Sequence, residues 1–161
     1  MKKANLKEAL GQLIQNEQVN ELFCVKYTHI FNSDEILLEL FTRISHQAIN
    51  NRTLMASYIE KNNTDKSLMV KDEEFESFTP LVHVDFGNFG TNEPITREKV
   101  LKSELRFLNI LVIGYETLSN YFKLEKELKP VAETVKKHCS EIEDYIEQGA
   151  DFEGQNQLSV Y

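Results

Sequence analysis

Apolar residues recur at helical spacing along four stretches of the chain. The first stretch runs from Leu6 to Phe31 and the second from Leu37 to Tyr58, with two more in the C-terminal half. Apolar side chains that repeat every three to four residues lie on one face of a helix. The pattern predicts four helices, over about residues 5–31, 34–61, 96–123 and 130–148.

Residues typical of helix ends support these boundaries. Asn5 and Glu8 resemble a capping box, and Asp34 is a preferred residue just before a helix. Pro130 fits a first helical turn, because its missing N–H would have no partner there, and Gly149 is typical of a helix end. We therefore expect the fourth helix to begin at Pro130 and to close at Gly149.

The connections between the helices predict the fold. The first and last connections are short, which is typical of antiparallel helical hairpins. Residues 62–95 lack helical periodicity and are long enough to cross the length of a bundle. The sequence predicts an all-α, up-down-up-down four-helix bundle over residues 1–149, with a long crossover between helices 2 and 3 and a polar, loose tail over residues 150–161.

Composition and charge narrow the class of protein. A chain of 161 residues suits one domain, and its six glycines and three prolines are few, which favours long helices. The net charge of −8 argues against a nucleic-acid partner, because no basic face offsets it. No apolar run approaches the roughly 18 residues of a membrane helix.

The N-terminus and the cysteines predict the location. Lys2 and Lys3 are followed by a mixed polar segment without the apolar run of a secretory signal. Cys24 and Cys139 form neither a disulfide framework nor a paired metal motif, and their predicted heights in the bundle are too different for a disulfide. We expect a cytoplasmic protein with two free thiols.

Five polar residues share the inward face of the predicted helices. They are Glu17 and Asn20 on the first helix, Asn51 on the second, Glu104 on the third and His138 on the fourth. With a rise of about 1.5 Å per residue, they fall within one or two turns of the same height. The pattern predicts a polar layer in the middle of the bundle.

His46 provides a contrast on the second helix. It lies two residues from both Ile44 and Ala48, so it points to the opposite side of the helix. We expect His46 to lie in solvent.

Buried acids are unfavourable unless they are paired, hydrogen-bonded or bound to a cation. The favoured interpretation is a hydrogen-bonded layer that fixes helix register, with Glu17 or Glu104 bonded to His138. The second interpretation is a metal site that holds a single Fe, Mn or Zn ion, since carboxylate and imidazole groups suit such metals. Its ligands would be Glu17, Glu104, His138 and Glu141. In the third, the inward directions are wrong and these residues lie on the flanks.

The helix layout resembles the ferritin-like superfamily. The segments "LFTRISHQAINNRTLMASYIEK" and "LKSELRFLNILVIGYETLSNYFKLEKELKPVAETVKKHCSEIEDYIEQ" are similar to its small bacterial members of unassigned function. The resemblance covers about residues 5–148. It implies a four-helix bundle and a possible role in metal handling or stress.

The resemblance also implies where metal ligands would lie. Di-iron members use one Glu on each of helices 1 and 3, for which Glu17 and Glu104 could stand, and a Glu-x-x-His on each of helices 2 and 4. Arg43 occupies the place of the acid on helix 2, and His138 and Glu141 come in reversed order on helix 4. This departure argues against a di-iron centre and leaves room for a single cation.

Apolar residues also occur on the predicted outer faces of helices 1 and 3. They are Val19, Leu22, Phe107, Ile110 and Ile113. Exposed apolar patches mark contact surfaces, so we expect the crossover to cover part of them and a second subunit in a homodimer to cover the rest. The leading hypothesis is therefore a non-catalytic bundle that forms a homodimer or binds a partner, with no cofactor.

Motifs of known enzyme chemistry do not favour catalysis. The sequence contains no phosphate-binding loop, nucleophile elbow or zinc motif. His83 and Asp85 lie two residues apart in the crossover, and an enzyme working from that segment is the weakest alternative.

Overall fold

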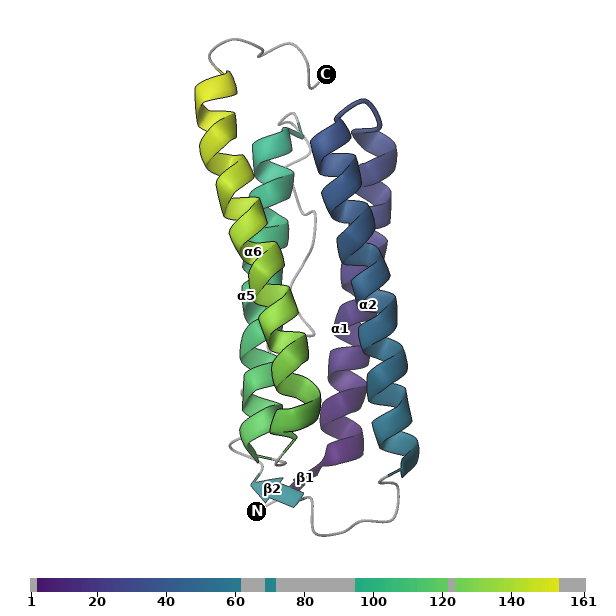
Figure 1. Ribbon diagram of the computed structural model, residues 1–161. Coiled ribbons are helices and arrows are strands. Elements are labelled where there is room, and N and C mark those ends of the chain that lie inside the picture. The colour runs from purple at the N-terminus through teal and green to yellow at the C-terminus, as the bar shows by residue number, and fades with distance from the viewer. Residues whose placement is uncertain (1–2, 62–68, 72–94, 122–123, 154–161) are drawn as a thin grey trace.

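The computed structural model describes residues 3–61, 69–71, 95–121 and 124–153 (Figure 1). Four long helices make up most of this part of the chain. They are α1 (Leu6–Ile30), α2 (Glu35–Lys61), α5 (Arg97–Tyr121) and α6 (Glu125–Glu153). Two short strands, β1 (Lys3–Asn5) and β2 (Met69–Lys71), pair antiparallel beside the start of α1. Within the described residues, the prediction of an all-α bundle of four long helices is confirmed, and the short β1–β2 pair is an addition that the apolar pattern does not predict.

Side-chain caps fix the starts of two helices. The Oδ1 atom of Asp34 accepts the N–H of Leu37 at 3.1 Å and so caps α2. The Oγ1 atom of Thr96 accepts the N–H of Lys99 at 3.2 Å and caps α5. Each bond satisfies an N–H that has no partner within the helix, so both predicted starts agree with the structure to within a residue.

The fourth helix is longer at both ends than predicted. The carbonyl of Leu124 accepts the N–H of Leu128 at 2.8 Å, so α6 begins before Pro130, which lies inside the helix. Gly149 also lies inside α6. A Cβ atom at this position would meet only the flexible end of the Arg97 side chain, at 3.3 Å from Nη1, so Gly149 neither ends the helix nor marks close backbone packing against α5.

The helices pack as two antiparallel hairpins, α1 with α2 and α5 with α6 (Figure 1). An ion pair between Arg97 Nε and Asp34 Oδ2, at 2.6 Å, joins the starts of α5 and α2. These two helices therefore run in the same direction. The predicted up-down-up-down order is wrong, because the observed order is up-down-down-up. The end of α2 and the start of α5 therefore lie at opposite ends of the bundle.

The core contains the predicted apolar positions of all four helices. Buried examples are Leu13 on α1, Phe41 on α2, Leu108 on α5 and Ile142 on α6. One prediction about the outer face of α5 is wrong, because Phe107 is buried. It continues the buried row of α5 that contains Val100, Glu104, Leu111 and Leu118, whose spacing of three, four and seven residues defines one helix face.

Three further predictions can be compared with the structure. His46 is exposed and both cysteines are free and buried, as predicted. The pair His83 and Asp85 and the tail beyond residue 153 lie outside the described residues. Within the described ranges, no helix is both long and apolar enough to cross a membrane.

Candidate functional site

A buried polar layer lies where the two hairpins meet. It takes side chains from α1, α2 and α5, and each of them is at most 2 % exposed. We use the name polar layer for Glu17, Asn20, Cys24, Asn51, Glu104 and Tyr115.

Glu17 is the acceptor at the centre of the polar layer. Its Oε2 atom accepts hydrogen bonds from the hydroxyl of Tyr115 and from Nδ2 of Asn51, each at 2.6 Å. Its Oε1 atom accepts a third bond from Nδ2 of Asn20 at 3.1 Å. Asn51 in turn accepts a bond from Gln47 at 2.8 Å. One carboxyl group thus ties α1 to both α2 and α5.

Glu104 is less well satisfied. Its Oε2 atom accepts the thiol of Cys24 at 2.9 Å, which joins α5 to α1 a second time. Its Oε1 atom is buried and has no hydrogen-bond partner. Leaving a buried polar atom unpaired costs about 1–3 kcal/mol, so Glu104 is the weak point of the layer.

Burial sets the protonation of both acids. It raises the pKa of Glu104 well above 4.5, and the nearby Glu17 raises it further, against the opposing bond from Cys24. Burial also raises the pKa of Glu17, but the three bonds from Tyr115, Asn51 and Asn20 oppose it. Glu104 is therefore the acid that most strongly retains its proton.

The pKa values of Tyr115 and Cys24, which donate hydrogen bonds to these acids, are also raised. Burial is the first cause that raises the pKa of Tyr115 and of Cys24, and the adjacent carboxyl groups raise both further. The thiolate and phenolate forms are thus disfavoured at neutral pH. Cys24 and Tyr115 therefore act as hydrogen-bond donors inside the layer, because nucleophilic attack by a cysteine needs its thiolate.

The remaining predicted site residues lie between α2 and α6. His138 is buried, and this burial lowers its pKa, an effect that Glu141 opposes. Glu141 forms an ion pair at 3.0 Å with Arg43, whose Nε atom also lies 2.6 Å from Oε1 of Glu39. Exposed ion pairs of this kind contribute about 0–1 kcal/mol, so they add little to stability.

The predicted ligands thus divide into two groups. Glu17 and Glu104 lie close together in the polar layer, whereas His138 and Glu141 lie beside Arg43. The expected bond from an acid to His138 is replaced by bonds from Cys24 and Tyr115. Within the part of the chain that the structure describes, no three histidine, cysteine, aspartate or glutamate side chains form a group that could hold a metal ion.

The sequence did carry a signal for the two donors. Cys24 lies four residues after Asn20 and seven after Glu17, so all three share one face of α1. Tyr115 lies eleven residues after Glu104, which is close to three turns of α5. Both residues also fit the apolar pattern of their helices, so the pattern alone does not separate them from ordinary core residues.

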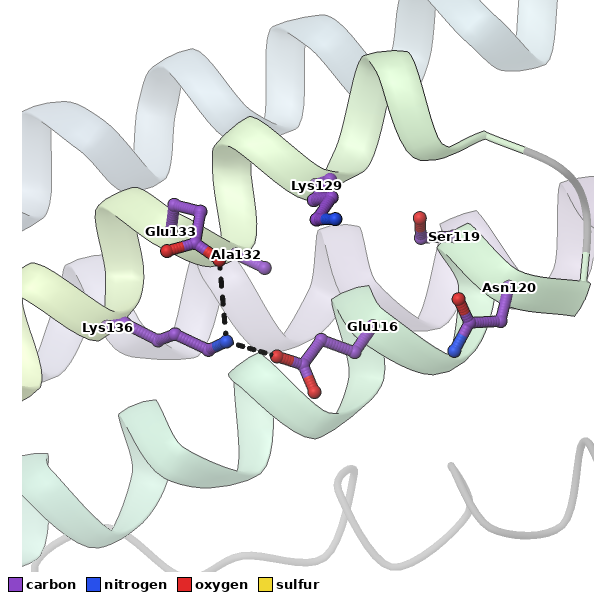
Figure 2. Close-up of a pocket in the computed structure, with 7 residues that line it drawn as sticks. All are labelled: Glu116, Ser119, Asn120, Lys129, Ala132, Glu133 and Lys136. Atoms are coloured by element: carbon purple, nitrogen blue, oxygen red, sulfur yellow. Dashed lines mark hydrogen bonds and ion pairs between the residues drawn. The ribbon is translucent and has the colours of Figure 1, made fainter.

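A small pocket of about 170 Å³ lies between α5 and α6 (Figure 2). Figure 2 shows Lys136 between the two carboxylates that line the pocket, at 2.6 Å from Glu116 and 3.5 Å from Glu133. Both acids share this one lysine, and all three side chains are about half exposed, which is typical of a surface ion pair.

The outward side of α1 carries an apolar strip. Leu22 is 61 % exposed, and Val19 and Val25 are 41 % and 40 % exposed on either side of it. Exposed polar residues continue the strip toward both ends of the helix. We use the name outer strip for Gln15, Gln18, Val19, Leu22, Val25, Lys26 and His29.

Comparison with known proteins adds no family to these observations. No protein-family model, no curated protein and no solved structure matches the chain.

Proposed function

We propose that this protein is a non-catalytic, cytoplasmic helical bundle that acts as an oligomerising or partner-binding module, with the outer strip of α1 as its contact surface. The observation that carries the proposal is the exposure of Val19, Leu22 and Val25 next to one another on a single helix face. One exposed leucine is ordinary, but adjacent exposed apolar residues are typical of contact surfaces.

The polar layer supports the non-catalytic part of this proposal. Both oxygens of Glu17 are occupied by donors, and the thiol of Cys24 is bonded to Glu104. Apart from Oε1 of Glu104, these side chains satisfy one another between the helices, which is the arrangement of a register-fixing layer. Their bonds favour one alignment of α5 against α1.

The helix directions support a ferritin-like arrangement as part of the same proposal. That arrangement has two antiparallel hairpins joined by one long crossover. Here α2 and α5 run in the same direction, with 35 residues between Lys61 and Arg97.

Replacing the central leucine of the outer strip tests the proposed function. We expect the wild-type protein to have a mass above the 18.7 kDa of one chain, and Leu22→Gln to shift it toward that value. Light scattering after size exclusion, across a wide range of concentration, measures both. Ile36→Gln is the matched control, because Ile36 is 44 % exposed but lies at the start of α2. A wild-type monomer at every concentration would contradict the proposal of self-assembly.

A single-cation site is the second candidate function. The observation that favours it is the unpaired, buried Oε1 atom of Glu104, beside the thiol of Cys24. The metal would have to displace the thiol proton of Cys24, and a carboxylate with the resulting thiolate suits zinc or iron better than manganese. We expect this pair, and not His138 with Glu141, to provide the first ligands.

Metal analysis separates the two candidates. Protein purified without chelator should contain stoichiometric zinc or iron if the second candidate is right, and Glu104→Gln should lose it. His138→Ala is the matched control, because His138 lies beside Arg43, where a second positive charge is unfavourable. Metal-free protein with unchanged stability after zinc or iron is added would exclude this candidate.

A further inference from the structure

The outer strip of α1 is nearly symmetric about Leu22. Val19 and Val25 lie three residues before and after it, and Gln15 and His29 lie seven residues before and after it. At about 100° per residue, Val19 and Val25 are each turned about 60° from Leu22, in opposite senses. Their exposed fractions are also almost equal. The strip therefore presents the same apolar profile when read in either direction.

A surface with this symmetry can pair with itself. In a two-fold dimer the same patch contacts its own copy. If the two helices run antiparallel, the residues after Leu22 in one copy lie beside the residues before Leu22 in the other copy. An antiparallel pair of α1 helices centred on Leu22 would bring the two Leu22 side chains together. It would also bring Val25 close to Gln18 of the partner copy.

The charges on the outer strip favour this orientation. The chain carries a net charge of −8, yet the outer strip contains no acid, and Glu21 beside it is already paired with Arg52. In a parallel pair, Lys26 would lie against Lys26 of the other copy. In the antiparallel pair it lies against Gln18 and Val19 instead, which removes this repulsion.

We infer that the outer strip binds a second copy of this chain through antiparallel pairing of the two α1 helices about Leu22. This inference rests on the proposed function and adds the identity and the orientation of the partner. Helix axes about 8–10 Å apart, each with a Cα radius of about 2.3 Å, would leave the two Leu22 Cα atoms about 3–5 Å apart. A disulfide can bridge the two positions if the helix axes are close to 10 Å apart.

Single cysteines introduced into the full chain test the inference by disulfide trapping. The native Cys24 and Cys139 are buried, so the wild-type protein serves as the background control. Under mild oxidation, Leu22→Cys should form a covalent dimer by itself. Gln18→Cys and Val25→Cys should each stay monomeric alone, because copies of one residue would be about 9–12 Å apart along the axis. An equal mixture of these two variants should cross-link.

The outcomes separate the inference from the proposed function. Covalent dimers of Gln18→Cys alone would show parallel pairing and overturn the antiparallel orientation. A dimer in light scattering that Leu22→Cys does not trap would overturn pairing through α1, while self-assembly would stand. A monomer in light scattering, with no trapping of any variant, would overturn both.

Discussion

Glu17 and Glu104 are two buried acids in the same layer, but they differ in how many of their oxygens are satisfied. Glu17 accepts three hydrogen bonds, and Glu104 accepts one from Cys24 and leaves Oε1 unpaired. Hydrogen bonds to a carboxylate favour its charged form, whereas burial favours the neutral form. The two acids should therefore respond differently to substitution and to pH.

Replacing Glu104 with glutamine should reduce the loss of stability at high pH. A raised pKa means that folded Glu104 keeps its proton at pH values where the unfolded chain has lost it, so the free energy of unfolding falls as pH rises above about 4.5. Glu104→Gln should flatten this fall by up to about 1.4 kcal/mol per pH unit, as measured by urea unfolding at acidic, neutral and alkaline pH. Identical slopes for the variant and the wild type would contradict the prediction.

Removing the hydroxyl of Tyr115 should destabilise the layer. Tyr115→Phe takes away the 2.6 Å bond to Glu17 and should lower the free energy of unfolding by about 1–3 kcal/mol. Tyr145→Phe on α6 is the control, because it makes the same change at a half-buried tyrosine outside the layer. Equal losses in the two variants would show that Tyr115 contributes no more than a peripheral tyrosine.

At the scale of elements, the two hairpins are held together at one end by Asp34. Its Oδ1 atom caps α2, while its Oδ2 atom pairs with Arg97 at the start of α5. The same side chain thus satisfies a helix terminus and links the hairpins. Such double use is possible because α2 and α5 start at the same end of the bundle.

Two substitutions separate the roles of Asp34. Asp34→Ala removes the cap and the ion pair and should lower the free energy of unfolding by about 1–2 kcal/mol. Arg97→Gln keeps the cap and should lower it by less than about 1 kcal/mol, because the pair is partly exposed. Thermal or urea unfolding of both variants measures the difference. Equal effects would mean that the cap contributes nothing beyond the ion pair.

Local patterns predicted the helices well, but they failed where two elements meet. The apolar periodicity and the cap at Asp34 depend on neighbours in sequence, so the sequence alone predicts them. Gly149 is typical of a helix end, but α6 continues through it to Glu153. Pro130 fits a first turn because its missing N–H has no partner there, but α6 begins at Glu125, where the carbonyl of Leu124 accepts the N–H of Leu128.

For the candidate site, the sequence predicted which side chains are buried but not which hydrogen bonds they form. Rotational phase along each helix correctly predicted that Glu17, Asn51, Glu104 and His138 are buried and that His46 is exposed. Rotational phase predicts the direction of a side chain but not its hydrogen-bond partner. The bonds from Cys24 and Tyr115 depend on how the two hairpins pack, so the sequence did not predict them. The burial of Phe107 was missed because the inward arc of α5 is wider than one row of residues.

At the scale of the whole molecule, net charge and apolar surface act against each other. Each copy carries a net charge of −8, so two copies repel at long range, although the outer strip itself has no acid. Salt screens such repulsion, with a screening length of about 10 Å at 0.1 M. Burial of apolar side chains does not need charge attraction.

Self-association should therefore strengthen as salt is added. We expect the dissociation constant of the dimer to fall between low and moderate ionic strength, as measured by sedimentation equilibrium. An interface held by opposite charges would show the reverse. Leu22→Gln should remain largely monomeric at both salt concentrations, because screening alone provides no contact.

The two contacts between α1 and α5 also bear on errors of assembly. If one hairpin slid along the other by a helical turn, Glu17 would lose Tyr115 and Glu104 would lose Cys24 together. Aliphatic side chains tolerate such sliding, since one aliphatic neighbour replaces another. A buried carboxyl group that loses its hydrogen-bond donor does not. The layer should thus act as a proofreading device that rejects misaligned docking.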